Sequence, residues 1–502
     1  MPLKYCIIIS VDTNSIFRGK DHLMKRFLCL LIIPALLLTL LAGCGASKNP
    51  ADEGDAGKSD GDEYFLNGVE LCEYAIVYSD TDPDYTKRAA EYLRDEIEAR
   101  TNIRLTVVSD TQQTVPLAHE IVVGETDRPI SSALDAETSG FEFSVLADED
   151  HIAMEGEYFV IAAAAYYFID TYIQAGTFSA TIPKEQTVHE PIIKPAENYI
   201  LLIGDGMGFN HTKLFDVFSA KELGMYSDGE EEFYGYMFPY MGKAHTNSLS
   251  GTTDSAASGT ALATGFKTFN TYVGKDGQMN NVPTLVEIAI ALDMATAVIS
   301  TETPLGATPA AFTSHVDSRL DVVDILVHQQ ALQNMYGTMI LGEYGANYDE
   351  AFIKERVEYE LHSVLNALIQ NENGFFLMYE EAYFDKHSHL NELQNTFCAA
   401  LRFNQIIGSV MEFVFYHPET LVIITADHET GGVTQNSDGS YYYTIDNHTA
   451  ADVPIFAYGM GAEVFDGATI ENIQIPKTIA AMWGIKLLGY QDEVYPSLIP
   501  VN

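Results

Sequence analysis

The segment that most clearly indicates the fold reads Thr420-Leu-Val-Ile-Ile-Thr425, followed by Ala426-Asp427-His428-Glu429-Thr430-Gly431-Gly432. An unbroken apolar run of this length is typical of a parallel strand that is buried on both faces of a sheet. Residues 199–203 have the same character, and strand and helix patterns alternate after them. We therefore expect residues 196–502 to form an α/β domain, a doubly wound, mostly parallel sheet with helices on both faces.

In such sheets, groups with a function gather beyond the carboxyl ends of the strands. Asp427 and His428 follow one strand directly, and an adjacent acid and imidazole are hard to explain as core residues. Asp205 follows another strand in a Gly-Asp-Gly turn, whose glycines allow a sharp bend that exposes the carboxylate. Taken alone, that turn is a weak signal. His448 precedes a further apolar segment, where most proteins would have an ordinary turn residue.

Residues 380–389, Glu-Glu-Ala-Tyr-Phe-Asp-Lys-His-Ser-His, contain residue types that bind metals. On a helix, Asp385 and His389 are four apart and share one face, with Cβ atoms about 5–6 Å apart. A carboxylate and an imidazole at that spacing can bind one zinc ion. Glu380 lies on the strand side of the same turn, where a hard oxygen ligand suits Mg²⁺. The alternative is a solvated surface helix with a chance His, which the segment alone favours.

Three further residues suit phosphate or cation chemistry. Ser255 opens a helix of small residues. It is either a helix cap or a nucleophile whose alkoxide is stabilised by the helix end and an adjoining metal. Thr308 has a hydroxyl oxygen that suits a hard cation. Arg319 has the forked guanidinium that binds two phosphate oxygens at once, although a surface ion pair is the alternative.

Together and in this order, these motifs resemble the alkaline phosphatase family over residues 198–485. The resemblance implies a secreted bacterial hydrolase that acts on small phosphate monoesters through a phosphoserine intermediate, with two zinc ions and one magnesium ion. It implies that Ser255 is the nucleophile, that Arg319 clamps phosphate, and that Lys386 reaches phosphate through water. The implied metal ligands are Asp385, His389 and His448 for the first zinc, Asp205, Asp427 and His428 for the second, and Asp205, Thr308 and Glu380 for magnesium.

The sequence also departs from the family pattern. Gly306 stands where many members carry Asp or His, two residues before Thr308. This removes a group beside the magnesium site, so metal preference and affinity do not follow from the resemblance. The segment between Arg319 and Gly374 is shorter than usual, and residues 428–448 leave no room for the crown domain of animal members. Substrate access and oligomeric state therefore stay open, a homodimer being one alternative.

Two other functions compete with a monoesterase. Phosphodiesterases and phosphonate hydrolases belong to the same superfamily, but diesterases usually lack the ligands of the third metal. Thr308, Glu380 and Arg319 therefore favour monoesters. A non-catalytic cell-surface binding protein is the other alternative, and the complete set of metal and nucleophile positions argues against it.

Charge excludes one class of partner. The 502 residues include 71 Asp and Glu against 27 Lys and Arg, a formal net charge of −44. Nucleic-acid binding needs a basic face, so we expect no nucleic-acid partner.

The N-terminus resembles an export signal. Met24-Lys25-Arg26 precedes an apolar run that is short for a membrane span, and Leu41-Ala42-Gly43-Cys44 resembles a bacterial lipobox. We expect a signal region over 1–43, with Met24 as an alternative start, and an acidic tether over 44–63. A lipid on Cys44 would anchor the exported protein at the outer face of a bacterial cell membrane. An ordinary signal peptide with a chance Cys is the alternative.

Residues 64–190 show their own alternation of strands and helices, which predicts a small α/β accessory domain. The pattern loosely resembles accessory domains ahead of secreted glycoside hydrolases, which favours a spacer or a module that binds glycan or another surface ligand. The exported body would retain Cys72 and Cys398. We expect buried free thiols, and a disulfide between them is the alternative.

Overall fold

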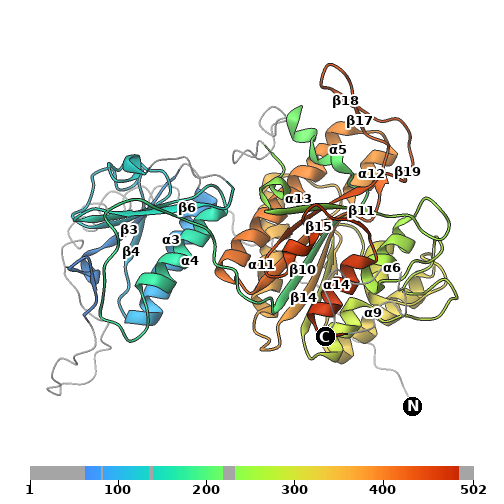
Figure 1. Ribbon diagram of the computed structural model, residues 1–502, viewed down its shortest axis with the longest axis horizontal. Helices are drawn as coiled ribbons and strands as arrows, with labels where there is room; N and C mark the ends of the chain where they lie inside the picture. Colours follow the sequence, from blue (N-terminus) through green and yellow to red (C-terminus); the bar gives the residue numbers. More distant parts are fainter. Residues whose placement is uncertain (1–62, 81–82, 135–139, 219–231, 486–502) are drawn as a thin grey trace, which may run out of the picture. The chain divides into compact units, whose positions relative to one another are not determined.

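The computed structural model describes residues 63–80, 83–134, 140–218 and 232–485 (Figure 1). The predicted signal region, Cys44 and all but the last residue of the predicted tether lie outside these ranges, so export and lipid anchoring stay predictions. In the part of the chain that the structure describes, no helix combines the length and apolarity needed to cross a membrane.

An eight-stranded sheet forms the centre of the region after residue 196, in the order β13-β12-β14-β10-β15-β20-β11-β21. The first five of these strands are parallel, while β20 runs antiparallel to both of its neighbours. Helices cover both faces, with α11 and α13 on one and α6, α9 and α14 on the other (Figure 1). The predicted doubly wound, mostly parallel sheet is confirmed. The strands are β10 (Asn198–Gly204), β11 (Tyr240–His245), β12 (Ala295–Ser300), β13 (Met339–Gly342), β14 (Phe375–Glu381), β15 (Thr420–Thr425), β20 (Val453–Tyr458) and β21 (Thr469–Glu471).

Every residue of β10, β14 and β15 is buried, as expected for strands covered on both faces. The longest helix, α13, packs its length against this core and buries even polar side chains such as Arg402 and Asn404. The helices are α5 (Phe209–Thr212), α6 (Ser255–Thr264), α7 (Leu285–Ala291), α8 (Ala307–Thr313), α9 (Val322–Tyr336), α10 (Glu350–Phe352), α11 (Tyr359–Leu368), α12 (Tyr383–His389), α13 (Leu393–Tyr416) and α14 (Gln474–Met482).

A six-stranded sheet in the order β4-β3-β5-β7-β6-β9 precedes this region. Its strands β4, β3, β5 and β7 are parallel, and β6 and β9 complete it in antiparallel pairing. The boundaries at 64–190 and 196–502, and the role of the accessory region, stay predictions. The elements are β3 (Ala75–Tyr78), α3 (Pro83–Thr101), β4 (Thr106–Ser109), β5 (Glu120–Val123), β6 (Phe143–Ala147), β7 (His151–Glu155), α4 (Val160–Tyr172) and β9 (Thr187–His189), beside a small sheet of β1 (Phe65–Leu66), β2 (Val69–Glu70) and β8 (Ser179–Ala180).

The two cysteines differ in state. Cys398 is a buried thiol on α13 that is not part of a disulfide, as predicted. Cys72 is disulfide-bonded, and its partner is not Cys398. The prediction of two free thiols is therefore wrong for Cys72, because two isolated cysteines give no spacing from which a pairing could be inferred.

The strand register brings the predicted site residues to one edge of the large sheet. Ile203 of β10 is level with Glu380 of β14 and Thr425 of β15, and Ser300 of β12 is level with Glu380. The residues that follow these positions therefore emerge side by side at the carboxyl edge. This edge carries the candidate site.

Candidate active site

The turn after β10 approaches helix α12 closely. Gly206 has a φ of 81°, and a Cβ at this position would lie 2.8 Å from the Cα atom of Asp385. Only glycine fits such a left-handed, crowded position without strain. The Gly206 amide donates to Asp427 Oδ1 at 3.1 Å. The turn thus brings Asp205 near the carboxylates of Asp385 and Asp427.

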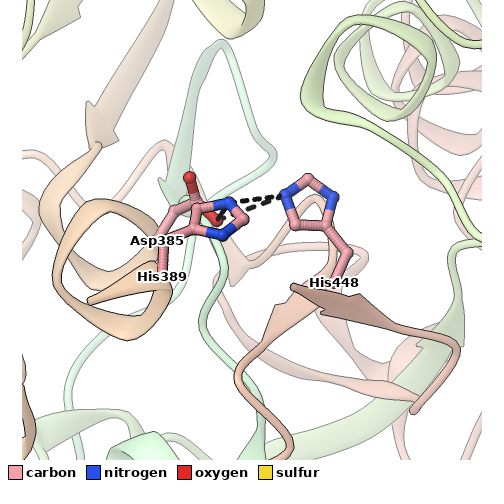
Figure 2. Close-up of side chains that lie close together, drawn as sticks. All are labelled: Asp385, His389 and His448. Carbon is pink, nitrogen blue, oxygen red and sulfur yellow. Dashed lines mark hydrogen bonds and ion pairs between the residues drawn. The ribbon is translucent and has the colours of Figure 1, made fainter. Parts of the chain in front are cut away.

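The first cluster joins Asp385 and His389 of α12 with His448 of β19 (His448–Thr449), as Figure 2 shows. The two imidazole Nε2 atoms lie 3.1 Å apart. Asp385 Oδ1 lies 3.3 Å from the Nε2 of His389 and 3.4 Å from that of His448. The predicted placement of Asp385 and His389 on one helical face is seen in the structure.

Backbone carbonyls fix the orientation of both rings. His389 Nδ1 lies 2.7 Å from the carbonyl oxygen of Asp446, and His448 Nδ1 lies 2.8 Å from that of Thr253. A carbonyl can only accept, so each neutral ring donates from Nδ1 and presents a lone pair at Nε2. Two lone pairs and a carboxylate oxygen therefore converge on one point.

This convergence fits a zinc ion. Ligand atoms arranged tetrahedrally at ordinary Zn–N and Zn–O distances lie about 3.3–3.5 Å apart, close to the separations found here. Without a cation, a proton on an imidazole balances the charge of the Asp385 carboxylate. The hydrogen bond to Asp385 raises the pKa of His389 to about 9. Burial would raise the pKa of Asp385, but its hydrogen bonds to His389 and His448 hold that pKa well below its usual range.

The second cluster contains Asp205, Asp427 and His428, all buried. His428 Nε2 lies 3.4 Å from Asp205 Oδ1 and 3.3 Å from Asp427 Oδ2. Burial lowers the pKa of His428 well below its ordinary value, and the nearby His448 ring, stacked on it at 3.6 Å between centroids, adds to the effect. A second cluster of metal-binding residues therefore lies directly next to the first, and the stacked rings of His428 and His448 form the contact between them.

Thr430 sets the proton position of His428. The Thr430 hydroxyl donates to Asp385 Oδ1 at 2.6 Å, so it accepts from the Nδ1 of His428, which lies 3.2 Å away. The Nε2 of His428 is therefore an acceptor, which is the form that binds a metal. In this structure it accepts from the Ser255 hydroxyl at 3.1 Å.

Ser255 is the first residue of α6, but it is not the cap. Asp254 fills that position, because its Oδ1 accepts from the amide of Ala257 at 2.9 Å. The alternative that Ser255 is a helix cap is therefore wrong. Its hydroxyl instead lies at the positive end of α6 and faces the second cluster, where a developing oxyanion is stabilised.

The third cluster contains Asp205, Thr308 and Glu380, and it also includes Glu302. Burial, together with the neighbouring Glu302 carboxylate, raises the pKa of Glu380 to about 8. Burial and the nearby Asp427 carboxylate raise the pKa of Asp205 well above its ordinary value. The Thr308 hydroxyl lies close enough to lower the pKa of Glu380, yet it forms no hydrogen bond of ordinary geometry.

Several buried oxygens at the site lack hydrogen bonds. They include Asp205 Oδ1, Asp427 Oδ2 and Glu380 Oε1. Unpaired buried carboxylate oxygens are costly and call for a charged partner. The first two clusters combine imidazole nitrogens with carboxylate oxygens, and the third offers oxygen atoms alone. This is the distribution of ligand types that the resemblance implies. The residues present therefore fit two zinc-type sites and one site for a hard cation.

The two predicted phosphate-binding residues lie at the edges of the site. Arg319 Nη1 lies 3.5 Å from Asp254 Oδ2, which ties the guanidinium to the helix that carries Ser255. Lys386 Nζ donates to Glu302 Oε2 at 2.6 Å. Burial would lower the pKa of Lys386, but the Glu302 carboxylate outweighs burial and raises it. The structure places both cations, and their contact with phosphate stays a prediction.

Sequence reasoning missed Glu302 and the buried pair of Glu381 and Arg402. Glu302 follows β12 at the edge where the other acids gather, so its position after a strand was an available signal. Glu381 and Arg402 are 21 residues apart in the sequence, and no local sequence pattern predicts their pairing. Arg402 Nε and Nη2 each donate to a Glu381 carboxylate oxygen at 2.7 Å, and both side chains are fully buried.

We predict that Arg402→Met lowers the free energy of unfolding by about 3–5 kcal/mol, because it leaves the Glu381 carboxylate buried and unpaired. Urea denaturation measures this loss. Adding Glu381→Gln, which removes the buried charge, is expected to recover part of the stability. Arg104→Met, at an exposed ion pair on the accessory region, is the matched control and should change stability by less than about 1 kcal/mol. A loss at Arg402 no larger than that of the control would contradict the prediction.

Comparison with known proteins shows which family has similar sequences. The family model for alkaline phosphatase matches residues 196–343 and 354–447. Alkaline phosphatase 4 of Bacillus subtilis is 28% identical over 297 residues, 48% of this chain and 63% of that protein. Alkaline phosphatase 3 of the same bacterium is 26% identical over 55% of this chain and 70% of its own length. Alkaline phosphatase of Escherichia coli strain K12 is 39% identical over 135 residues, 25% of this chain and 27% of that protein.

Solved structures of the same kind are also similar. Alkaline phosphatase from the Antarctic bacterium TAB5 is 24% identical, with 58% of this chain and 98% of that chain covered and a TM-score of 0.48. The cold-active alkaline phosphatase of Shewanella sp. is 23% identical, with 57% and 99% covered and a TM-score of 0.49. Through residues 196–447, the chain belongs to the alkaline phosphatase family.

Proposed function

We propose that this protein hydrolyses phosphate monoesters through a phosphoserine intermediate on Ser255, with two zinc ions and one magnesium ion as cofactors. One observation carries the proposal: the Ser255 hydroxyl lies 3.1 Å from an imidazole nitrogen that is itself oriented as a metal ligand. A potential nucleophile thus adjoins the second cluster, and the stacked rings of His428 and His448 place the first cluster next to it.

Each of the three clusters would hold one metal ion. The first cluster, Asp385, His389 and His448, would hold one zinc, and Asp205, Asp427 and His428 would hold the other. The oxygen-rich cluster around Glu380 and Thr308 would hold magnesium. When bound, such ions supply Lewis-acid stabilisation of charge and favour ionised oxygen nucleophiles near neutral pH.

The chain's own groups would act in two stages. The Ser255 oxygen gives up its proton and bonds to phosphorus as the ester oxygen departs and becomes an alcohol. Water then attacks the phosphoserine, which restores the Ser255 hydroxyl and releases inorganic phosphate. Arg319 complements the non-bridging oxygens, where charge lies in a loose transition state. Its contact with Asp254 keeps the guanidinium next to the start of α6.

A phosphodiesterase or phosphonate hydrolase is the competing function. The third cluster favours a monoesterase, because a further cation beside the phosphate site matches the additional negative charge of a monoester. That cluster is complete in this chain, with Glu380 fully buried and its Oε1 without a hydrogen bond.

A paired assay separates the two functions. Purified protein with Zn²⁺ and Mg²⁺ is expected to hydrolyse p-nitrophenyl phosphate at alkaline pH much faster than bis-p-nitrophenyl phosphate, and metal analysis on the same sample reports how far the sites are filled. Equal rates on the two esters, or no hydrolysis of the monoester with metals bound, would contradict the monoesterase proposal.

A further inference from the structure

Gly306 leaves an open space beside the third cluster, and Glu302 fills it. A Cβ atom at Gly306 would lie 2.3 Å from Glu302 Oε1 and 2.7 Å from its carboxyl carbon. The Glu302 carboxylate therefore occupies the place that a side chain at residue 306 would take. Glu302 precedes Gly306 by four residues, so an acid from earlier in the same loop reaches that point.

Glu302 contributes to the cation cluster itself. A carboxylate oxygen from each of Asp205, Glu302 and Glu380 lies within 4.8 Å of the others. Three carboxylate groups that share so small a volume repel one another unless a cation lies between them. Oxygen-only donor sets of this kind suit Mg²⁺ and similar hard cations.

A second observation points to a bound ion. Glu380 Oε1 and the Thr308 hydroxyl belong to fully buried side chains, and neither has a hydrogen bond of ordinary geometry. Both belong to residues of the third cluster. The other oxygen of Glu380 is satisfied by the Ser300 hydroxyl. The unpaired atoms therefore mark the ligand side of the cluster.

The backbone holds Glu302 in place from two directions. Its amide donates to the Ser300 hydroxyl at 3.1 Å, and its carbonyl accepts from the Glu343 amide at 2.9 Å. Its side chain is only 16% exposed and accepts from Lys386 at 2.6 Å. The carboxylate is thus fixed between the cation cluster and a lysine at the edge of the site.

We propose that Glu302 completes the third cation site of this chain, in the place that Gly306 leaves open, and that the same carboxylate positions Lys386. The identity of the cation as Mg²⁺ rests on the proposed function, but the role of Glu302 in binding a hard cation does not. Glu302 is thereby a cation-binding and positioning residue that compensates for the glycine.

The test measures Mg²⁺ binding directly. Calorimetric titration of zinc-loaded protein with MgCl₂ is expected to give a dissociation constant about 10- to 100-fold higher for Glu302→Gln than for the unchanged chain. Glutamine keeps the volume of the side chain, so the fold is retained, and circular dichroism and thermal unfolding of the metal-free variant check this. Glu343→Gln, which neutralises an exposed acid beside the same loop, is the matched control and should leave the constant unchanged.

A rescue variant sharpens the test. Gly306 has φ −60° and ψ 163° at the N-cap of α8, a conformation and position that suit aspartate. Glu302→Ala with Gly306→Asp should therefore recover at least tenfold of the Mg²⁺ affinity that Glu302→Ala loses.

Mg²⁺ affinity in Glu302→Gln equal to that of the unchanged chain, or equally weakened in Glu343→Gln, would overturn the proposal. The titration measures Mg²⁺ binding without any ester. The role of Glu302 can therefore be decided even if the protein fails to hydrolyse the phosphate monoester.

Discussion

Replacing Ser255 by alanine is expected to lower the turnover of a phosphate monoester by at least about 10⁴-fold, since removal of a covalent nucleophile costs this much or more. The structure gives three reasons for such a large effect. Ser255 lies at the positive end of α6, its hydroxyl faces the second cluster, and Asp254 already satisfies the helix end. The hydroxyl thus has no structural task that the helix depends on.

Two controls show whether the loss of turnover comes from the missing nucleophile. Zinc content and thermal unfolding of Ser255→Ala should match those of the unchanged chain, because the metal ligands are other residues. Ser363→Ala removes the same group from the exposed part of α11, where the hydroxyl donates only to the carbonyl of Tyr359, and should retain full turnover. A Ser255→Ala protein that keeps more than a tenth of the activity would rule out the phosphoserine route.

Chelation is expected to abolish the activity and to make the protein less stable at alkaline pH. In the metal-free protein, stability should fall steadily as the pH rises from about 6.5 to 9. Several groups with raised pKa values cause this fall, among them three residues of the site. The pKa of His389 is raised to about 9, that of Glu380 to about 8 and that of Asp427 to about 7, each above its ordinary value.

The sign follows from proton linkage. A group whose pKa is raised by folding binds its proton more tightly in the folded state, so its contribution is present below its unfolded pKa and lost as the pH rises through its folded pKa. For His389 that window is 6.5 to about 9, and the two acids lose their contributions by about pH 8. The lowered pKa values of Asp385 and His428 act in the opposite direction, but only below pH 6.5.

Bound metal requires the same groups without their protons, so metal affinity increases with pH and should cancel the fall. Urea midpoints at several pH values, with EDTA or with Zn²⁺ and Mg²⁺, measure both curves. His389→Gln is the informative variant, because it should flatten the upper part of the EDTA curve. A metal-free protein that is equally stable at pH 6.5 and pH 9 would contradict the assigned protonation states.

Local patterns predicted much of this structure. The apolar runs gave β15 its bounds and β10 to within one residue, because a strand buried on both faces needs an uninterrupted apolar sequence. The spacing of Asp385 and His389 placed them on one face of α12, since helical geometry alone fixes that relation. The wrong alternative, Ser255 as a cap, arose because Asp254 and Ser255 are both good caps and only the backbone decides between them.

The position of Glu302 after a strand was a signal, but the partners of Glu302 and of Arg402 depend on contacts across the fold. Glu302 joins the third cluster only because a strand register brings β12 level with β14, and because Gly306 leaves room for it. The pairing of Arg402 with Glu381 needs α13 to bring its side chain to the end of β14. No periodicity encodes either meeting, since each is set by how distant elements pack.

Thr430 has one hydroxyl proton and contacts both histidine clusters. Because that proton is given to Asp385, the ring of His428 must supply the next one from Nδ1. The tautomer of His428 in the second cluster is therefore tied to the hydrogen bond that Asp385 of the first cluster accepts. A side chain that is no metal ligand thus keeps the Nε2 of His428 an acceptor before any ion binds, so this ring does not have to change its tautomer when a metal binds.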